Sequence, residues 1–482
     1  MGGMATKQVL LINTNTARPP IAPLGLDYLA DDLRAAEFEP TLVDLAWEPD
    51  SHKGVANALA EAAPLAVGLT IRNTDTCFLL APQPYLRQFR DLVGCIRRHT
   101  DAPIVAGGCG FSIFGQPLCR YLDVDYGIQG DGEKAFAALL QVVERNGRES
   151  AAEAAAGIDG VIARTSQSPS KLNQAPPRGA SPRDFVDNRR YFQLGGQMGF
   201  ETKRGCNQAC IYCADPVAKG RALRLREPTA VADELEALVG QGIDVLHTCD
   251  AEFNAPPEHA EAICRELIGR GLGSRLRWYA YCQVSGFSDE LCRLMRRAGC
   301  VGINFGVDAV CDTMLRRLGR SYRAADVVPV VTACRREGIA VMLDLLLGGP
   351  GETLETLTET IDAVKRMDPD CAGAALGVRV YPNTPLAALV RQQGPIAGNP
   401  NLLGQTGDNE ALLEPVFYVE HALGPQPHRL VYKMIAGDER FFVADPDQVE
   451  ANYDYSENQR LCEAIADGAR GAYWDILRNL HD

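Results

Sequence analysis

The N-terminal part of the chain, residues 7 to about 145, alternates short apolar runs with amphipathic stretches. Short apolar runs bounded by turn residues are typical of buried parallel strands, whereas apolar positions at helical spacing are typical of amphipathic helices. The repeated order of strand, helix and strand therefore predicts an α/β fold with a parallel, doubly wound, Rossmann-like sheet. We predict strands at residues 9–13, 41–45, 65–71, 104–106 and 126–129, and helices at residues 24–36, 55–62, 85–99, 113–121 and 134–143.

A second series of the same kind follows between residue 199 and about residue 381. Its units predict a partial (β/α)6 barrel, in which functional residues lie where the strands end. We predict strands near Phe200 and at residues 245–248, 277–281, 302–305, 341–347 and 375–380, with helices at residues 229–239, 258–270, 289–297, 324–337 and 354–366.

The stretches outside these two series suggest the domain boundaries. We expect domains at residues 1–145 and 191–392, a linker at 146–190 that is rich in Pro, Ser and charge, and a mostly helical C-terminal extension at 393–482. A short strand near residues 158–164 would interrupt the linker, and the extension is predicted to hold a strand at 414–419 and helices at 428–435 and 457–477.

The extension is rich in aromatic residues, for which two roles are open. They either form a cap over the barrel that contacts substrate, or they anchor the extension to the barrel. They are Phe417, Tyr418, Tyr432, Phe441, Phe442, Tyr453, Tyr455, Tyr473 and Trp474.

Composition narrows the function classes. The 482 residues are 46% hydrophobic, which is ample material for roughly three domains. A net charge of −14 and a pI near 5.1 disfavour nucleic-acid binding and favour a small-molecule or peptide substrate. The first apolar run is too short for a signal peptide, and no stretch approaches a membrane span, so we expect a cytoplasmic protein with no membrane partner.

The candidate chemistry centres on the stretch E-T-K-R-G-C-N-Q-A-C-I-Y-C-A-D-P, which places Cys206, Cys210 and Cys213 in a C-x3-C-x2-C pattern. Cysteine thiolates are the usual ligands of iron–sulfur clusters, and a cubane cluster needs four ligands. Three cysteines on one loop therefore leave one iron open to a small molecule. The alternative is a structural zinc site, which needs four closed ligands. The next candidates, His247 and Cys249, lie more than thirty positions further on in a predicted strand.

This loop resembles the signature of the radical S-adenosylmethionine (SAM) enzymes, which have an aromatic residue before the last cysteine, here Tyr212. In that family the open iron of a [4Fe-4S] cluster is chelated by SAM, and an electron from the cluster cleaves SAM to a 5′-deoxyadenosyl radical. The resemblance also implies contacts with SAM or substrate at the strand ends, for which a capping or packing role is the alternative. The candidates are Asp250, Glu252, Tyr281, Gln283, Asn304, Asp308 and Gly349.

In the N-terminal domain a ligand is expected beyond the carboxyl ends of the strands. The G-x-G-x-x-G fingerprint and the P-loop are absent, so a dinucleotide is not expected. The domain instead resembles the cobalamin-binding domain of a large radical SAM subgroup, through P-L-G-L-D-Y-L-A, R-N-T-D, G-G-C-G-F-S and G-D-G-E. The glycines would let the corrin approach the backbone closely. The implied contacts are Arg72, Asn73, Gly107, Gly108, Ser112, Gly130 and Glu133. The alternative is a Rossmann-like module that has no ligand.

The D-x-H-x-x-G loop that supplies a histidine to cobalt in other cobalamin proteins is missing here. We therefore expect no protein imidazole on cobalt, and the resemblance makes Arg72 the candidate for covering the lower corrin face. A cation near cobalt would disfavour a lower ligand and favour Co(I). The alternative is that Arg72 pairs with Asp75 or Asp44 at the surface.

Together the motifs resemble the cobalamin-dependent radical SAM enzymes over nearly the whole chain. The resemblance implies methylation of an unactivated carbon, or of phosphorus, in a natural product or peptide. One SAM would supply the methyl group through cobalamin, a second SAM would supply the radical, and a flavodoxin or ferredoxin would supply electrons. Some relatives methylate an aromatic carbon without hydrogen abstraction, and Arg72 is compatible with that variant.

Three alternatives to this function remain open. The first is cyclisation or rearrangement by an enzyme of the same architecture. The second is a non-enzymatic corrinoid- or SAM-binding protein. The third is a tRNA-modifying radical enzyme, which is disfavoured by the acidic composition.

Overall fold

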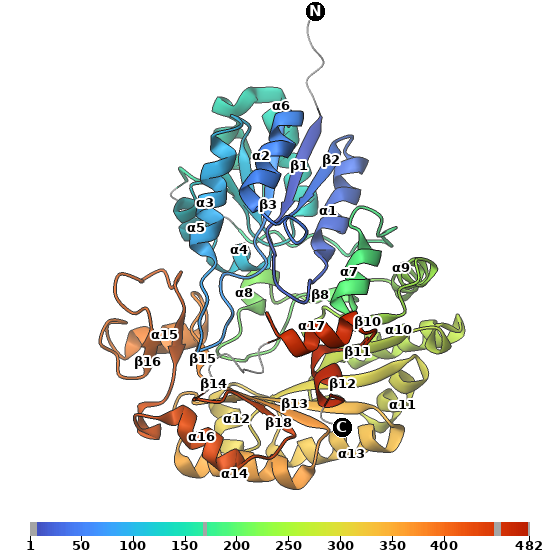
Figure 1. Ribbon diagram of the computed structural model, residues 1–482, viewed down its shortest axis with the longest axis vertical. Helices are drawn as coiled ribbons and strands as arrows, with labels where there is room; N and C mark the ends of the chain where they lie inside the picture. Colours follow the sequence, from blue (N-terminus) through green and yellow to red (C-terminus); the bar gives the residue numbers. More distant parts are fainter. Residues whose placement is uncertain (1–6, 167–170, 448–454, 481–482) are drawn as a thin grey trace, which may run out of the picture.

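The computed structural model describes residues 7–166, 171–447 and 455–480 (Figure 1). An N-terminal α/β unit stands above a larger C-terminal α/β unit. Strand β1 starts near the N-terminus at the top of Figure 1, and its carboxyl end points toward the lower unit. The loops in which ligands of parallel sheets bind therefore face the second unit.

The upper sheet has the strand order β2-β1-β3-β4-β5-β6, and β1 to β5 pair in parallel. This order is the doubly wound topology in which ligands bind at the switch point between β1 and β3. The predicted Rossmann-like sheet is thus confirmed. Its strands are β1 (Gln8–Asn13), β2 (Glu39–Asp44), β3 (Ala66–Thr70), β4 (Ile104–Gly107), β5 (Tyr126–Ile128) and β6 (Val161–Ala163). Its helices are α1 (Leu24–Ala35), α2 (Ser51–Glu61), α3 (Leu86–Arg97), α4 (Cys109–Phe114), α5 (Gln116–Leu122) and α6 (Glu133–Ala155).

Two details of this unit differ from the sequence-based expectation. The helix predicted at 113–121 is divided into α4 and α5, because Gly115 between them has φ +57°, outside the helical region. Helix α6 continues past residue 145, and β6 pairs antiparallel with β5. Residues expected in the linker therefore complete the edge of the upper sheet.

The lower sheet is a parallel partial barrel with the order β18-β14-β13-β12-β11-β10-β7. Strand residues such as Leu246, Trp278 and Leu343 face outward and pack under the helices, whereas their neighbours along each strand face inward. The predicted partial barrel is confirmed, and β18 from the C-terminal extension adds an edge strand that the sequence did not reveal. The strands are β7 (Met198–Phe200), β10 (Val245–Thr248), β11 (Arg277–Cys282), β12 (Cys300–Asp308), β13 (Ala340–Leu347), β14 (Cys371–Leu376) and β18 (Phe441–Val443). The covering helices are α9 (Pro228–Gly240), α10 (Pro257–Gly269), α11 (Asp289–Arg297), α12 (Asp312–Arg317), α13 (Val327–Glu337) and α14 (Leu354–Met367), with short 3-10 turns η1 (Leu272–Ser274) and η2 (Ala324–Asp326).

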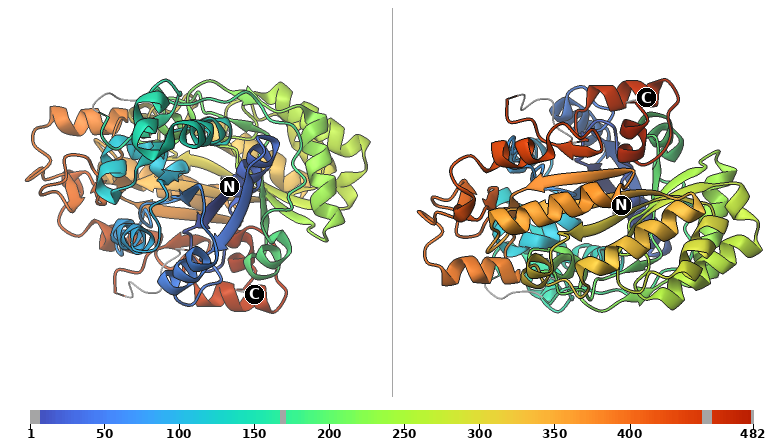
Figure 2. Two further views of the ribbon diagram at one scale, coloured as in Figure 1. Left: turned by 90° about the horizontal axis from the view of Figure 1, so that it is seen from above. Right: turned by 90° about the horizontal axis from the view of Figure 1, so that it is seen from below.

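The C-terminal extension is built into the barrel in several places (Figure 2). The predicted helix at 457–477 is divided by two glycines with positive φ, Gly468 and Gly471. The two resulting helices pack on the inner face of the barrel at the start of its strands. There Trp474 lies against Tyr279 and Gly302, where a glycine leaves room for both rings. Two elements precede the extension, β15 (Val378–Arg379) and α15 (Pro385–Gln392). Besides β18, the extension contains β16 (Leu402–Gly404), β17 (Val416–Tyr418), η3 (His421–Leu423), α16 (Pro427–Ile435), α17 (Gln459–Ala466) and α18 (Tyr473–Arg478).

Helices α17 and α18 therefore form a floor in the lower half of the barrel. Tyr473 and Trp474 are buried in it, as the anchoring interpretation requires. Tyr453 lies outside the described residues. A cap function for the extension stays a prediction.

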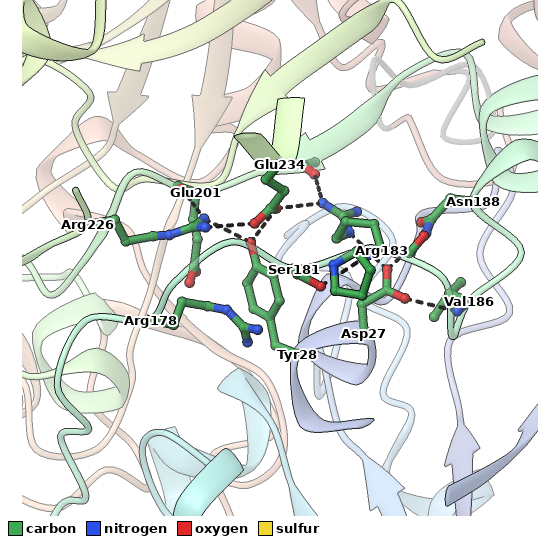
Figure 3. Close-up of polar contacts among 12 residues, drawn as sticks. Asp27, Tyr28, Arg178, Ser181, Arg183, Val186, Asn188, Glu201, Arg226 and Glu234 are labelled. Atoms are coloured by element: carbon green, nitrogen blue, oxygen red, sulfur yellow. Dashed lines mark hydrogen bonds and ion pairs between the residues drawn. The ribbon is translucent and has the colours of Figure 1, made fainter. Parts of the chain in front are cut away.

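A buried ion network joins the two units (Figure 3). Arg183 follows α6 and β6 in the chain and donates to Asp27 of α1 (2.9 Å) and to Glu234 of α9 (3.1 Å). The Tyr28 hydroxyl and the Arg226 guanidinium also donate to Glu234, each at a distance of 2.7 Å. These side chains are almost fully buried, so the network holds the two units in one relative orientation. We call Asp27, Tyr28, Arg183, Arg226 and Glu234 the interdomain network.

None of the helices in the described ranges is long and apolar enough to cross a membrane.

Candidate active site

The three cysteines lie on the loop that connects β8 (Lys203–Arg204) to helix α8 (Asp215–Lys219). Strand β9 (Arg224–Leu225) follows α8 and pairs antiparallel with β8. Helix α8 packs against α4 of the upper unit, so the loop lies where the two units meet. An adjacent helix, α7 (Asn188–Gly195), leads into the barrel.

The three thiols differ in exposure, and burial raises the pKa of each of them in the absence of a bound cluster. Cys206 is buried, and Cys210 and Cys213 are half-buried. Burial raises the pKa of Cys206 to about 11, and burial together with the nearby charges of Asp215, Cys210 and Cys206 raises the pKa of Cys213. Within the described ranges, no group of three His, Cys, Asp or Glu side chains is arranged around a single metal ion. The spacing of the three cysteines on one loop is what indicates a shared cluster, in which each thiolate would bind a separate iron atom.

The turn after α12 supports the cysteine loop through three consecutive residues. The Ile211 N–H donates to the Leu318 carbonyl (3.0 Å). Gly319 has φ +80°, and a side chain at this position would begin 2.3 Å from a carbonyl of the loop. Arg320 then donates from Nη1 to Sγ of Cys210 (2.9 Å). Sequence reasoning missed Arg320, because no spacing rule links it to the cysteines.

Asp308, Tyr212 and Glu252, which were expected at the site, are brought together around Arg320. Asp308 lies at a bulge of β12 with φ +61°, a conformation that is costly for a residue with a side chain. Its carboxylate accepts from the Tyr212 hydroxyl (2.6 Å) and lies 3.4 Å from Nε of Arg320. Glu252 lies 3.9 Å from Nη2 of Arg320, and burial raises the pKa of Glu252 to about 7.

Asp250 has a different set of partners from the one expected. Its carboxylate accepts from the Thr202 backbone N–H (2.8 Å), the Thr202 hydroxyl (2.5 Å) and Nζ of Lys203 (3.2 Å). These contacts use both oxygens and leave none free for an ammonium group of SAM. Asp250 therefore holds the segment that leads into the cysteine loop.

Gln283 and Gly349 lie on the carboxyl side of the barrel. The Gln283 backbone N–H donates to Asn254 Oδ1 (2.9 Å), and the residue is buried. A side chain at Gly349 would begin 3.0 Å from Leu318, so this glycine permits close packing against the turn that supports the cysteine loop. Contacts of Gln283 and Gly349 with SAM stay predictions.

Polar residues on the inner face of the barrel form a second group. Asn304 donates to Oδ2 of Asp344 (2.7 Å), and burial raises the pKa of Asp344 to about 6. Tyr281 is 43% exposed, yet burial by surrounding protein raises its pKa to about 12, as expected for a side chain that lines a concave space. The His247 ring lies 4.8 Å from the Tyr281 ring, and burial lowers the pKa of His247 to about 4. Sequence reasoning missed Asp344, although a lone aspartate within the apolar run A-V-M-L-D-L-L-L was a usable signal.

Arg72 follows β3 by two residues and is exposed. Its positive charge acts on Tyr281 and on Tyr473, which belong to the lower unit. The Asn73 amide is within hydrogen-bond distance of the Arg72 carbonyl (3.0 Å) and guanidinium (3.2 Å).

The carboxylates suggested as surface partners of Arg72 are occupied by other groups. Asp75 pairs with Arg379 (3.0 Å), and Asp44 accepts from the Tyr191 hydroxyl (2.8 Å). In residues 7–166, 171–447 and 455–480 no ion pair of Arg72 is found. Arg72 is therefore available to a ligand between the units.

Ser112 ties the neighbouring loops of the upper sheet together. Its hydroxyl donates to the Gly108 carbonyl (2.8 Å) and accepts from the Gly130 N–H (2.9 Å). A side chain at Gly108 would begin 2.7 Å from the Ile71 carbonyl, and both glycines have positive φ. Close packing of the protein's own backbone is therefore sufficient to require glycine at positions 108 and 130, without any contact with cobalamin. Gly107 has ordinary contacts only, so its expected contact with cobalamin stays a prediction.

Glu133 is committed to the contact between the units. Arg204 donates to its carboxylate (2.6 Å), and Asp131 beside it pairs with Arg224 (2.9 Å). Burial alone would raise the pKa of Glu133, but the charge and hydrogen bond of Arg204, a backbone hydrogen bond and the charge of Arg178 together outweigh burial and lower it. The G-D-G-E motif therefore joins the upper unit to the hairpin that carries the cysteine loop. Oε2 of Glu133 is buried with no hydrogen-bond partner in the described part of the chain, and the expected contact of Glu133 with cobalamin stays a prediction.

Comparison with known proteins agrees with this geometry. Residues 200–364 match the model of the radical SAM superfamily, and residues 10–140 match that of the B12 binding domain. The chain is 33% identical over 452 residues to tryptophan 2-C-methyltransferase of Streptomyces laurentii, an alignment that covers 80% of this chain and 74% of that protein. The chain belongs to the cobalamin-dependent radical SAM methyltransferases.

Solved structures of a related methyltransferase have the same fold along the whole chain. One is the radical SAM methyltransferase TsrM of Kitasatospora setae with tryptophan substrate and a SAM analogue, aza-SAM. It has a TM-score of 0.89 and 32% identity, and the alignment covers 99% of this chain and all of that one. The same protein with cobalamin and a [4Fe-4S] cluster has a TM-score of 0.88 and 30% identity, covering 99% and 98% of the two chains.

This radical SAM methyltransferase therefore uses a [4Fe-4S] cluster, SAM and cobalamin, as the sequence predicted. The expected methyl transfer is confirmed in its general form, so it is an enzyme rather than a binding protein.

Proposed function

We propose that this methyltransferase transfers a methyl group to a ring carbon of tryptophan or of a closely related indole amino acid. The related enzymes named above act on or bind tryptophan. The observation that carries the proposal is the position of Tyr281. It is accessible on the inner face of the barrel and is acted on by Arg72 of the upper unit and by Asp344 of the barrel. An aromatic substrate beside Tyr281 would lie between the two cofactor-binding units.

The cysteine side of this site would hold the cluster and SAM. Cys206, Cys210 and Cys213 ligate the cluster, and Arg320 holds Cys210 in place. Around them, the proposed SAM contacts are Tyr212, Glu252, Gln283, Asp308 and Gly349. Asn304, which the resemblance also implied as a contact of SAM, donates to Asp344, and we propose that it faces the substrate instead.

The upper unit would hold cobalamin at the switch point of its sheet. The proposed contacts are Arg72, Asn73, Gly107, Gly108, Ser112 and Gly130. Arg72 would lie near the bound corrin and supply a positive charge there, which would favour an electron-rich metal. A guanidinium has no electron pair to offer to the metal.

When bound, cobalamin supplies the methyl group, which comes from SAM, and the cluster supplies electrons. The protein's own contribution is to hold the two units in a fixed relative position. The interdomain network fixes α1 of the upper unit against α9 of the barrel, and Arg204 fixes the cysteine hairpin against Glu133. The distance between the two cofactor sites is then set by buried contacts rather than by a flexible linker.

The remaining partners are proposals of the same kind. We propose a flavodoxin or ferredoxin as electron donor, a cytoplasmic location, and no nucleic-acid partner. The acidic composition supports the last of these.

The proposal is tested with anaerobically purified protein supplied with iron, sulfide and cobalamin. L-Tryptophan, SAM and a reductant are added, and methyltryptophan and S-adenosylhomocysteine are measured by mass spectrometry. Both products are expected in equal amounts from the wild type and neither from Cys210→Ala. Fully loaded protein that forms no methyltryptophan would refute the choice of substrate.

An Arg72→Ala variant separates the role of this cation from general folding. Because the guanidinium is exposed and unpaired in the described ranges, its loss leaves the fold intact. We expect cobalamin binding to persist while the rate of methylation falls by at least tenfold, and Arg72→Lys to recover part of the rate.

A further inference from the structure

We propose that Asp344 binds the ammonium group of the substrate and so selects amino acids and amines over uncharged aromatic compounds. The inference rests on the proposed function, because it names the residue that recognises the substrate of that same site.

The position of Asp344 is the first argument. It lies on β13 with its side chain on the inner face of the barrel, where its charge acts on the exposed Tyr281. A side chain at Gly373 on the neighbouring strand β14 would begin 2.5 Å from Oδ1 of Asp344. Glycine at this position therefore leaves the space that the carboxylate occupies.

The second argument is that this carboxylate has no cation of its own. Among the described residues, Asp344 has Asn304 as its hydrogen-bond donor, and no Lys, Arg or His forms an ion pair with it. Arg320 is directed to Asp308 and Glu252, and Arg72, whose charge acts on the same Tyr281, forms no ion pair with Asp344 in the described part of the chain. A half-buried carboxylate without a counter-ion is unfavourable, and a ligand ammonium would remove that cost.

The third argument is the unused acceptor beside it. Asn304 gives its amide N–H to Asp344, and its Oδ1 is buried with no hydrogen-bond partner in the described part of the chain. An ammonium group has three donors and no acceptor, so it complements a carboxylate next to an amide oxygen.

The fourth argument distinguishes the substrate from SAM as the source of the ammonium group. Arg320, which donates to Cys210 (2.9 Å), lies 3.4 Å from Asp308 and 3.9 Å from Glu252, so these two carboxylates lie on the cysteine side of the site. Asp344 forms no hydrogen bond or ion pair with Arg320 in the described part of the chain, and its hydrogen bond is with Asn304. We therefore assign Asp344 to the substrate.

The test compares three ligands of the cobalamin- and cluster-loaded protein by calorimetry. L-Tryptophan and tryptamine have an ammonium group, and indole-3-propionate lacks it. In Asp344→Asn we expect affinity for the first two to fall about tenfold or more, the effect of losing a charge-assisted hydrogen bond, while indole-3-propionate binds within about twofold of the wild type. Asp362→Asn, which removes an exposed carboxylate from the outer helix α14, is the matched control and should change none of the three.

The outcomes separate the inference from the proposed function. If the wild type binds none of the three indole ligands, the proposed function is refuted. If the wild type binds tryptophan and the Asp344→Asn variant binds it equally well, the inference alone is overturned. The inference is also overturned if the variant loses affinity for SAM and keeps its affinity for tryptophan. If Asp344→Asn misfolds and binds none of the ligands, the Asp344→Glu variant, which keeps the charge, is measured instead. This variant must still bind tryptophan more tightly than indole-3-propionate, and the absence of this preference overturns the inference.

Discussion

Arg320 donates a hydrogen bond to Sγ of Cys210 over 2.9 Å, from a turn more than a hundred residues further along the chain. Its guanidinium also contacts the Gly306 carbonyl and Asp308, so its orientation is held by protein groups other than the thiol. A cationic hydrogen-bond donor therefore lies against Cys210, a proposed ligand of the cluster.

We expect Arg320→Met to make the reduction potential of the cluster more negative. Hydrogen bonds to the cluster sulfurs and nearby positive charge both stabilise the reduced cluster. The reduction potential of the cluster in Arg320→Lys, which keeps the charge, should lie between those of Arg320→Met and the wild type. The measurement is a redox titration followed by electron paramagnetic resonance. Arg316→Met, an exposed arginine of α12, is the control, and equal potentials in all the proteins would show that Arg320 only packs.

We expect Arg183→Met to destabilise the protein by about 3–5 kcal/mol, because it leaves Asp27 and Glu234 buried without their shared cation. The matched control is Arg34→Met. Arg34 also joins α1 to the segment between the units, through Asp184 (2.7 Å), but both side chains are largely exposed. That pair should contribute less than about 1 kcal/mol. Urea unfolding of the two variants measures the difference, and equal losses would mean that the interdomain network does not hold the units together.

We expect Trp474→Ala to cost about 3–5 kcal/mol, since it empties the floor of the barrel beneath Tyr279 and Gly302. Tyr432→Ala removes an exposed aromatic residue of the same extension and should change stability by less than about 0.5 kcal/mol. Thermal unfolding provides the comparison. A stable Trp474→Ala variant with impaired turnover alone would favour the cap interpretation instead.

We expect tryptophan affinity to fall as the pH is lowered through about 6, because protonation of Asp344 removes the charge that binds the ammonium group. The facing groups do not reverse this sign: Tyr281 stays neutral here, and Asp308 is a second acid. Asp344→Asn should abolish the pH dependence. Calorimetry between pH 5 and pH 8 tests it, and a flat wild-type profile would contradict it.

The same group affects the stability of the unliganded protein with the opposite pH trend. Burial raises the pKa of Asp344 from its usual 3.8 to about 6, so the folded state holds this proton more tightly than the unfolded chain. Its contribution to stability is present below about pH 4 and is lost as the pH rises through about 6. The difference in stability between wild type and Asp344→Asn should therefore vary over this window.

The sequence was a good guide wherever the signal is local. The spacing of Cys206, Cys210 and Cys213 identifies a cluster loop without knowledge of the fold, because the ligands sit on one short segment. The apolar periodicity likewise predicted the strands of both sheets apart from β18. Motif residues were harder to interpret: Asp250 and Glu133 lie at the expected strand ends, but partners from distant segments occupy their carboxylates.

What the sequence determined by itself was the pair of α/β units, the three-cysteine loop and the cofactors that they imply, since each depends on neighbours along the chain. The tertiary structure alone decided that Arg320 contacts Cys210, that Asp344 has no counter-ion, and that α17 and α18 fill the barrel floor. These facts depend on which distant side chains share one low-dielectric space, and packing of the whole chain determines that proximity.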